Sequence, residues 1–389
     1  MLSVILNKGE EKEKLDGFPW VFSNEINNFD GEIVNGSVVR VETIDRKFVG
    51  YGFLNTSSKI MVRFLSLDEN EVIDKEFFKK RIAYAKSHRD IINYDNSSNC
   101  YRVVFSEADH LPGLIVDKYG DYLSIQILSL GLNNIKQDII DILVELYNPK
   151  GIYERSDSPV RLKEGLPEFK GPIYGEFDPR VEVLENNIRF IVDMENGQKT
   201  GYFLDQKFNR DIVKYYAKDK EVLDCFSNVG GFALHSAHYG AKHVDALDIS
   251  KKACDDIMYN ASLNGFNNIN AVCVDVFDYL RNTDKTYDVV VLDPPAFTKD
   301  KETVKKAYRG YKEINLSALK LVRSGGYLLT FSCSQHMTPS LFMEMVKDAA
   351  HDANREVQMV DFRIQSPDHP SRLESIEQLY LKCIILRVK

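Results

Sequence analysis

Hydrophobic and polar residues alternate along most of the first 72 residues of the chain. The alternation is clearest in Ser37–Val41, Phe48–Phe53 and Ile60–Leu65, and it is typical of strands with one buried face. The pair Asn35-Gly36 supplies a turn before the first of these stretches. We therefore expect residues 1–72 to form a small β-barrel.

Residues 73–178 mix helical and strand patterns. Ile73–Ile92 repeats apolar residues at helical spacing, and its basic side predicts either a solvated face or part of an RNA-facing surface. Glycine and proline recur through Pro159–Pro179, so we expect a loop or linker there. Together these patterns predict a small central α+β domain. Its other expected elements are strand Tyr101–Ser106, a hairpin of Leu114–Lys118 and Tyr122–Leu128, helix Ile135–Tyr147 and strand Gly151–Glu154.

Residues 179–389 begin with a hairpin, Val181–Leu184 with Ile188–Val192, and then alternate strands with helices. Several strands are continuous apolar runs such as YDVVVLD, as expected when helices cover both faces of a parallel sheet. The alternation predicts a doubly wound α/β fold, whose ligands bind beyond the carboxyl ends of the strands. The expected strands are Glu221–Cys225, His243–Asp248, Ile269–Val274, Tyr287–Asp293, Gly326–Phe331, Val357–Arg363 and Gln378–Val388.

Composition and charge narrow the classes of protein that fit. Hydrophobic residues make up 44% of the 389 residues and charged residues 28%, which excludes a fully disordered chain. The net charge is −8, so binding to nucleic acid would depend on local basic patches and not on a general positive field. No apolar run approaches the roughly 18 residues of a membrane helix, and we expect no membrane partner.

The cysteines and histidines point to free thiols and no metal. The six cysteines include no CxxC pair, and no signal-peptide pattern begins the chain. We therefore expect reduced thiols and a cytoplasmic protein. His235 and His238 lie three residues apart on an expected helix, but no third ligand accompanies them.

Acidic residues stand at the ends of four expected strands. Asp224 precedes a glycine-containing turn and then a helix, where the backbone can approach a ligand and free N–H groups are available. Asp248 follows 24 residues later, a spacing that suits a carboxylate accepting both ribose hydroxyls. Asp275 can accept from an adenine amino group while Phe277 packs on the ring, and Asp293 ends the fourth strand. Any one of these acids could instead cap a helix.

The charge of this edge decides between ligand classes. A dinucleotide site needs G-x-G-x-x-G, whereas this turn has only the adjacent pair Gly230-Gly231. Asp224 would repel a pyrophosphate and attract an ammonium. S-adenosylmethionine carries adenine, ribose, a sulfonium and an amino-acid tail without phosphate, so we expect it as the cofactor. Besides the four acids and Phe277, the residues expected to contact it are Phe226, Ser227, Asn228, Gly230, Ile249 and Val276.

Longer stretches carry a more specific resemblance. Residues 222–334 resemble a class I S-adenosylmethionine-dependent methyltransferase. The stretches GYFLDQKFNR, LDCFSNVGGFALHSAHYGA, DVVVLDPPAFTK, YRGYKEIN and LLTFSCS resemble those of the RlmI-like group, the bacterial large-subunit ribosomal RNA cytosine-5 methyltransferases with an N-terminal PUA domain. GFPWVFSNEI resembles the start of that PUA domain, so the resemblance covers nearly the whole chain.

The resemblance implies an architecture and partners. It implies a PUA-like β-barrel, a small central domain and a Rossmann-like methyltransferase domain with a mixed seven-stranded sheet whose last strand is antiparallel. We expect these domains at 1–72, 73–178 and 179–389. The implied substrate is large-subunit (23S) ribosomal RNA, and analogy suggests a homodimer. The resemblance also places Gln206 and Arg210 near the amino-acid tail of the cofactor, although a capped helix start at Asp205 explains that stretch equally well.

A candidate nucleophile follows the expected strand Gly326–Phe331. Most cysteines are inert buried thiols, but the strand-end position of Cys333 and the TFSCS stretch favour a catalytic role. A thiolate that adds to carbon 6 of cytosine makes carbon 5 nucleophilic, and a protonated Asp293 would support the ring nitrogen. The carbon-5 proton must then leave. Ala296 stands where related enzymes have a second cysteine, and His336 is a weak candidate helper.

Two other functions stay open from the sequence. Asp293-Pro-Pro-Ala-Phe297 also resembles the signature of amino-group methyltransferases, which would act on guanine or another amine without a thiol. The second of these functions is that of a non-catalytic RNA-binding assembly factor with a vestigial methyltransferase fold. The intact set of strand-end acids argues against that function.

Basic residues and tyrosines gather after Asp293, beginning with Lys299 and Lys301. Such a segment suits phosphate contact and stacking of a flipped or single-stranded base, which the target must be to reach Cys333. A solvated helix is the plainer interpretation. The residues expected to contact RNA are Lys305, Lys306, Tyr308, Arg309, Tyr311 and Lys312.

Overall fold

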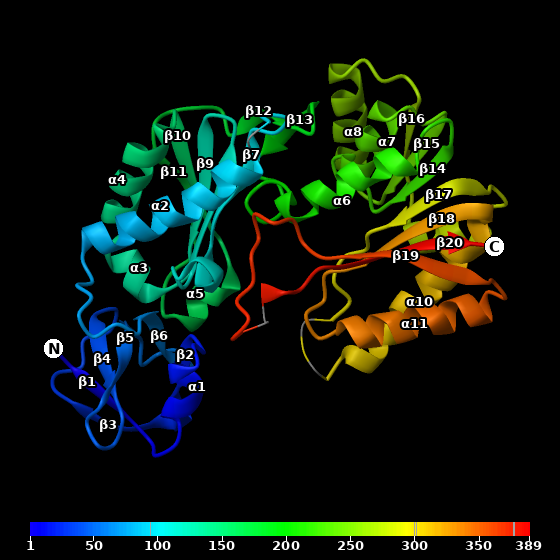
Figure 1. Ribbon diagram of the computed structural model, residues 1–389. Helices are drawn as coiled ribbons and strands as arrows, with labels where there is room; N and C mark the ends of the chain where they lie inside the picture. Colours follow the sequence, from blue (N-terminus) through cyan, green and yellow to red (C-terminus); the bar gives the residue numbers. More distant parts are fainter. Residues whose placement is uncertain (94, 299, 301, 376–377) are drawn as a thin grey trace. The chain divides into compact units, whose positions relative to one another are not determined.

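The computed structural model describes residues 1–93, 95–298, 300, 302–375 and 378–389, which form two compact units (Figure 1). The units group segments by packing and do not cut the chain at single points, so the domain boundaries predicted at residues 72 and 178 stay a prediction. The first unit comprises Met1–Val183, Val192–Leu204 and Pro367–Gln378, and the second comprises Leu184–Ile191, Asp205–Ser366 and Leu379–Lys389.

The N-terminal part of the first unit is a six-stranded sheet in the order β2-β6-β5-β4-β1-β3. The three predicted strands are present as β4, β5 and β6. The strands β1 to β3 were not predicted, because runs of three to five residues are too short to show a clear alternation. Val4, Val39 and Val41 are buried in the core of this sheet. The elements are β1 (Ser3–Leu6), α1 (Glu11–Leu15), β2 (Trp20–Phe22), η1 (Ser23–Glu25), β3 (Ile26–Asp30), β4 (Val38–Glu42), β5 (Phe48–Leu54) and β6 (Ile60–Ser66).

The central part of the first unit is a five-stranded sheet in the order β11-β10-β9-β8-β7. Helix α2 packs on β7 and on α4, and Ile82, Val104, Ile125 and Leu143 share one buried core. This agrees with the predicted α+β pattern. The elements are α2 (Lys75–Ile92), β7 (Cys100–Phe105), η2 (Ser106–Asp109), β8 (Leu114–Tyr119), β9 (Tyr122–Ile127), α3 (Leu130–Asn134), α4 (Lys136–Tyr147), β10 (Gly151–Ser156), α5 (Pro159–Lys163) and β11 (Phe169–Tyr174).

The stretch Pro159–Pro179, predicted as a loop, contains helix α5 and strand β11. The Ser158 side chain caps α5, and proline at the first helical position needs no N–H partner. Strand β11 pairs antiparallel with β10 at the edge of the sheet, where Pro172 is tolerated. The prediction of a loop was therefore wrong for these residues, because glycine and proline are also compatible with a strand at the edge of a sheet.

Two later segments join the first unit through buried hydrogen bonds. Arg155 Nη1 donates to the carbonyl of Met194 at 2.7 Å. The Asp368 carboxylate accepts from the backbone N–H of Arg102 at 2.8 Å, and the Arg102 guanidinium pairs with the buried Asp117. Buried charges need such partners, so these contacts decide where segments 192–204 and 367–378 pack.

The second unit contains a seven-stranded sheet in the order β16-β15-β14-β17-β18-β20-β19. The pairs from β16 to β18 are parallel, and β20 is antiparallel to both of its neighbours. The mixed sheet with an antiparallel last strand is confirmed. The last strand begins at Lys382 and not at Gln378, because its pairing with β18 begins at Ser332. The strands are β14 (Glu221–Cys225), β15 (His243–Asp248), β16 (Ile269–Cys273), β17 (Tyr287–Leu292), β18 (Val322–Ser332), β19 (Val357–Arg363) and β20 (Lys382–Val388).

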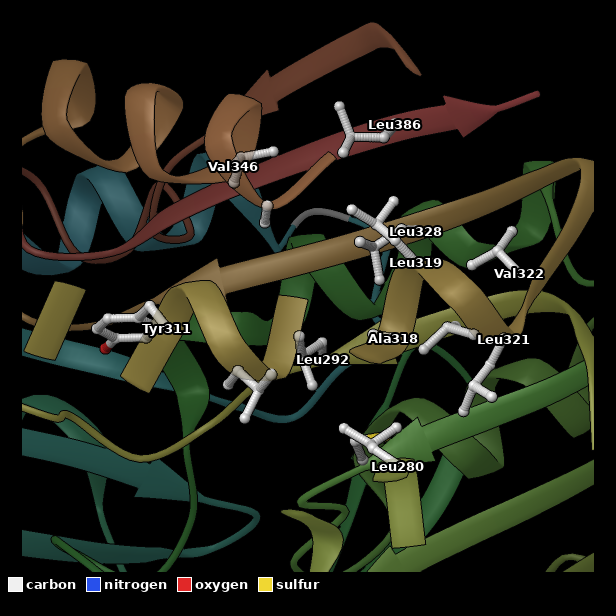
Figure 2. Packing of buried hydrophobic residues seen from close by; sticks show 14 of the residues in the cluster. Leu280, Leu292, Tyr311, Ala318, Leu319, Leu321, Val322, Leu328, Val346 and Leu386 are labelled. Carbon is white, nitrogen blue, oxygen red and sulfur yellow. The ribbon is translucent and has the colours of Figure 1, made fainter. Parts of the chain in front are cut away.

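Helices cover both faces of this sheet. Successive residues of a strand point to opposite faces, so each strand contributes side chains to both layers of packing. Leu328 points into a core with Val346 of α11 and Leu386 of β20 (Figure 2). Phe331, three residues on, packs instead on Phe232 of α7, with ring centroids 5.2 Å apart. Each such buried side chain stabilises the fold by about 1.5–3 kcal/mol. The remaining elements are β12 (Arg180–Glu185), β13 (Ile188–Asp193), η3 (Leu204–Gln206), α6 (Lys207–Asp211), η4 (Ile212–Tyr215), α7 (Gly231–His238), α8 (Lys251–Leu263), α9 (Val276–Asn282), α10 (Val304–Leu321) and α11 (Pro339–Asp352).

Candidate active site

The carboxyl ends of the five parallel strands β14 to β18 lie at one edge of the seven-stranded sheet. Cys225 of β14 is opposite Leu247 of β15 and Leu292 of β17, and Leu292 is opposite Thr330 of β18. This register brings the predicted strand-end residues to the same edge. They are Asp224, Asp248, Asp275, Asp293 and Cys333.

Asp224 is only 1% exposed, and its two oxygens have different surroundings. Its Oδ2 accepts from the backbone N–H of Ala233 in the first turn of α7 at 3.0 Å. Its buried Oδ1 has no hydrogen-bond partner among the described residues. Burial raises the pKa of Asp224 to about 7, and the negative charge of Asp293 adds to the rise. An unpaired buried carboxylate oxygen of this kind is suited to an ammonium ligand.

The turn that follows Asp224 folds tightly because three of its residues adopt positive φ. These residues are Phe226, Asn228 and Gly230. The Ser227 side chain closes the turn by donating to the Asp224 carbonyl at 2.8 Å. At the start of α7, a Cβ on Gly231 would come within 2.6 Å of Arg210 Nε, so the close approach of this arginine requires glycine.

Arg210 and Gln206 lie beside this edge with partners that the sequence did not predict. Arg210 is buried, and its Nη1 donates to both oxygens of the buried Glu185 at 2.7 and 2.9 Å. Gln206 Nε2 donates to Asp293 Oδ2 at 2.9 Å. Gln206 thus orients the predicted catalytic acid, and contact of either residue with the cofactor tail stays a prediction.

Asp248 fastens two loops at the end of β15. Its Oδ2 accepts from the backbone N–H of Asn228 at 3.0 Å, and its Oδ1 accepts from that of Ser250 at 2.9 Å. Each carboxylate oxygen can accept a second hydrogen bond, which leaves capacity for ribose hydroxyls. The next residue, Ile249, is 70% exposed and offers an apolar surface beside the carboxylate.

Asp275 caps helix α9, which is the alternative role that the sequence left open for each strand-end acid. Its side chain accepts from the backbone N–H of Asp278 at 3.1 Å, and the following Val276 is buried. Phe277 is half-buried in an aromatic row, with ring centroids 6.3 Å from Phe226 and 6.0 Å from Phe297. This row gives the site flat apolar walls.

Cys333 is half-buried directly after β18, whereas most of the other thiols are buried. Burial raises the pKa of the Cys225 and Cys383 thiols well above their usual range, so these two stay protonated and inert. The residue after Cys333 is held firmly. Ser334 Oγ lies 2.9 Å from the Tyr311 hydroxyl, and the Ser334 carbonyl accepts from Lys382 Nζ at 2.7 Å.

Lys382 and Glu185 are functional candidates that sequence reasoning missed. Lys382 interrupts the apolar run LKCIIL with a charge, and that interruption was the available signal. The pattern of a strand does not indicate which residue a buried charge will contact, so the role of Lys382 could not be predicted. Glu185 ends a hairpin strand and gave no signal, because its partner Arg210 lies 25 residues away.

The basic segment after Asp293 lies on helix α10. Lys305, Lys306 and Arg309 are exposed, as RNA contact would require. Tyr308 is half-buried and donates to Asp348 at 2.6 Å, and Lys312 pairs with Asp352 at 2.7 Å.

Tyr311 corrects the prediction that its ring contacts RNA. The residue is fully buried under the loop that follows Cys333, because it shares the apolar face of α10 with Ala307 and Ile314. Lys299 and Lys301, which begin the basic segment, lie outside the described residues.

Two family models match the chain. Residues 4–67 match a PUA-like domain, and residues 172–378 match an S-adenosylmethionine-dependent methyltransferase. The ribosomal RNA large subunit methyltransferase I of Aliivibrio fischeri (strain MJ11) is 40% identical over 393 residues, which cover 100% of this chain and 99% of that protein. The protein of the same name from Aeromonas hydrophila subsp. hydrophila is 42% identical over 395 residues, with 100% and 99% covered.

The chain belongs to the ribosomal RNA large subunit methyltransferase I family. It is therefore an S-adenosylmethionine-dependent methyltransferase with an N-terminal PUA-like domain, which confirms the resemblance drawn from its motifs. The crystal structure of SMU.776 in complex with SAH has a TM-score of 0.85 to this structure, with 100% of both chains covered and 23% identity. At that identity the likeness concerns the fold.

The residues of this family member fit S-adenosylmethionine. The unpaired Asp224 Oδ1 can accept from the amino group of its tail, and Asp248 can accept from ribose hydroxyls. Ile249 and Phe277 supply apolar surface for adenine. In the described part of the chain, no group of three potential ligands could hold a metal ion. Across those residues, no helix has the length and apolar character to cross a membrane.

Proposed function

We propose that this chain methylates carbon 5 of a cytosine in large-subunit ribosomal RNA, with the Cys333 thiolate as nucleophile. As a family member it is a methyltransferase of large-subunit ribosomal RNA that depends on S-adenosylmethionine. The observation that carries the finer proposal is the half-buried Cys333 at the end of β18, on the strand next to the one followed by Asp293. Cys273 is exposed, but it ends β16, three strands away from β17.

In this proposal the cofactor lies over the ends of β14, β15 and β16. Asp224 and the turn from Phe226 to Gly230 would hold its amino-acid tail, Asp248 its ribose, and Asp275 with Phe277 its adenine. When bound, S-adenosylmethionine supplies the methyl group as an electrophile. The residues of the chain hold the two reactants and exclude water.

Cys333 and Asp293 would act on the cytosine ring. The Cys333 thiolate forms a bond to carbon 6, and the electrons of the 5,6 double bond become available at carbon 5. Asp293, oriented by Gln206, donates a hydrogen bond to the ring nitrogen that gathers charge. After carbon 5 is methylated its proton leaves to a base, the double bond re-forms and the carbon–sulfur bond breaks. Ala296 follows the two prolines, so that base is not a cysteine at this position.

Methyl-labelled S-adenosylmethionine and unmethylated large-subunit ribosomal RNA test the product. After incubation the RNA is digested and the labelled nucleoside is identified, and we expect 5-methylcytidine. Label in a methylated guanosine would contradict the proposal and favour the amino-group reaction suggested by Asp293-Pro-Pro-Ala-Phe297. If S-adenosylmethionine failed to bind saturably, a non-catalytic assembly factor would be favoured instead.

Cys333→Ala tests the nucleophile. We expect methyl transfer to fall by at least a thousandfold, while the affinity for S-adenosylmethionine stays within about twofold, because the thiol forms the covalent bond and holds no part of the cofactor. Cys100→Ala is the control, since it removes a thiol on strand β7 of the first unit and should leave turnover unchanged. Near-normal turnover of Cys333→Ala would exclude the covalent mechanism.

A further inference from the structure

A buried lysine contacts the segment that carries Cys333. Lys382 is the first residue of β20, is 1% exposed, and stands opposite Ser332 in the ladder with β18. Its Nζ donates to the carbonyl of Ser334 and to the carbonyl of Tyr380, each at 2.7 Å. Two of its three N–H donors are thus used on the backbone. The first of these bonds is made to the residue that directly follows Cys333.

Lys382 differs from the buried Lys14, which has a carboxylate partner. Lys14, also fully buried, pairs with Glu25 at 2.8 Å. Among the described residues, no Asp or Glu lies within ion-pair distance of Lys382 Nζ. A buried ammonium without an anion is costly. The Cys333 thiol can supply the missing negative charge, because Lys382 stands opposite Ser332 and is bonded to Ser334, the two residues that flank Cys333.

The direction of this interaction favours an ammonium beside a thiolate. Burial lowers the pKa of Lys382 to about 8, and a negative Cys333 opposes that fall. An amine with that pKa is close to the ordinary range of a thiol. Such an amine is mostly protonated at pH 7, so Lys382 faces the thiol as an ammonium.

Four other ionisable groups near this edge of the sheet do not supply that positive charge. Tyr311 of α10 has a pKa raised by burial and stays neutral, and so does the Cys383 thiol on β20. Asp293, after β17, carries a negative charge when ionised and would oppose a thiolate. Arg363 of β19 is already paired with Asp361 at 3.1 Å.

We propose that Lys382 is the positioning residue of Cys333, holding its loop and forming an ammonium–thiolate pair with it. The inference rests on the proposed function, in which Cys333 is the nucleophile. The Cys333 S–H group gives its proton to solvent, and the Lys382 ammonium stabilises the thiolate that remains. The thiolate then adds to carbon 6 of cytosine, and when the carbon–sulfur bond breaks the sulfur leaves as a thiolate that the ammonium again stabilises.

The rate of alkylation by iodoacetamide against pH tests the pair without RNA. Mass spectrometry of the digested protein follows Cys333 and Cys273 separately, and the exposed Cys273 serves as the internal reference. In the wild-type protein we expect the Cys333 profile to have its midpoint at least one pH unit below that of Cys273. A Cys333 midpoint equal to or above that of Cys273 would overturn the proposal.

Two variants separate charge from packing. In Lys382→Met the Cys333 midpoint should rise by one unit or more, which lowers its thiolate fraction near pH 7 about tenfold. Lys382→Arg keeps a positive charge and should keep the wild-type midpoint. S-adenosylmethionine binding serves as the folding check. An unchanged profile in a folded Lys382→Met protein, or equal shifts in both variants, would refute the role of the charge.

The assay distinguishes this inference from the proposed function. Alkylation reports on the thiol alone, whereas the labelled nucleoside reports on the reaction. Label outside 5-methylcytidine with a Lys382-dependent Cys333 would refute the proposed function and leave the pair intact. Label in 5-methylcytidine with a Lys382-independent thiol would refute the pair alone.

Discussion

The two oxygens of Asp224 have unequal surroundings, and this sets how the site should respond to pH. Oδ2 is bonded to Ala233, whereas the buried Oδ1 lacks a partner in the described structure. Because the folded pKa of about 7 lies above the unfolded value, the folded state holds the proton more tightly. This contribution to the free energy of unfolding is complete at low pH and is lost as the pH rises towards 7.

Cofactor affinity should therefore rise with pH. An ammonium binds the ionised form of Asp224, and the ionised fraction of a group with pKa 7 grows about eightfold between pH 6 and pH 7.5. We expect the dissociation constant of S-adenosylmethionine to fall several-fold over this range in calorimetric titrations. Asp224→Asn should weaken binding and remove most of the pH dependence. A wild-type affinity that does not change with pH would contradict this role.

Asp248→Ala provides the comparison. It removes the acceptor expected for the ribose hydroxyls, and the loss of two hydrogen bonds to a charged group should weaken binding at least tenfold. Its pH dependence should stay like that of the wild type, because Asp224 is intact. An unchanged dissociation constant would mean that the ribose does not bind at Asp248.

At the scale of one element, helix α10 separates two tasks by its faces. Ala307, Tyr311 and Ile314 pack into the core, and Figure 2 shows the Tyr311 ring there. The Tyr311 hydroxyl also lies 2.9 Å from Ser334 Oγ, in the segment after Cys333. Lys305, Lys306 and Arg309 lie on the exposed side. The same helix can therefore hold the segment after Cys333 with one face and offer positive charge to a phosphate backbone with the other.

Reversal of the exposed charges tests the outer face. The triple variant Lys305→Glu, Lys306→Glu, Arg309→Glu should bind RNA at least tenfold more weakly. The slope of log affinity against log salt concentration should become less steep by about 0.7 for each lost phosphate contact. Lys320→Glu, an exposed change in the last turn of the same helix, is the matched control. Filter-binding titrations at several salt concentrations measure both. An effect no larger than that of the control would identify a simple solvated face.

At the scale of the whole molecule, long-range hydrogen bonds decide which segments fold together. Asp368 is fully buried in the first unit, where its Oδ2 accepts from the backbone of Arg102. Asp368 also lies beside His369, with Oδ1 and Nδ1 3.0 Å apart. A segment near the end of the sequence is thus fixed to strand β7, some 266 positions earlier.

Asp368→Ala should destabilise the first unit selectively. The change leaves a buried N–H of Arg102 without its acceptor, at a cost of about 1–3 kcal/mol. Trp20, the only tryptophan of the chain, lies in the first unit, so its fluorescence during urea unfolding reports on that unit. Asp45→Ala, at an exposed turn, serves as the control. Equal midpoints for the two variants would show that Asp368 does not anchor the segment.

The fold and much of the candidate site could be predicted because their signals are local. Each strand-end acid follows its own apolar run, and the parallel order of the strands brings Asp224, Asp248 and Asp293 to one edge. The contact of Gln206 with Asp293 could not be predicted in this way, because 87 residues separate the two side chains.

The sequence by itself determined the alternating α/β pattern, the cofactor class and the candidate nucleophile Cys333. Tertiary structure alone decided that Lys382 lies behind Cys333, that Arg210 pairs with Glu185 and that Tyr311 is buried. The physical reason is the distance along the chain over which each signal acts. Strand periodicity and turn chemistry act over a few neighbouring residues, whereas the partner of a buried charge is set by the register and direction of strands that are far apart in the chain.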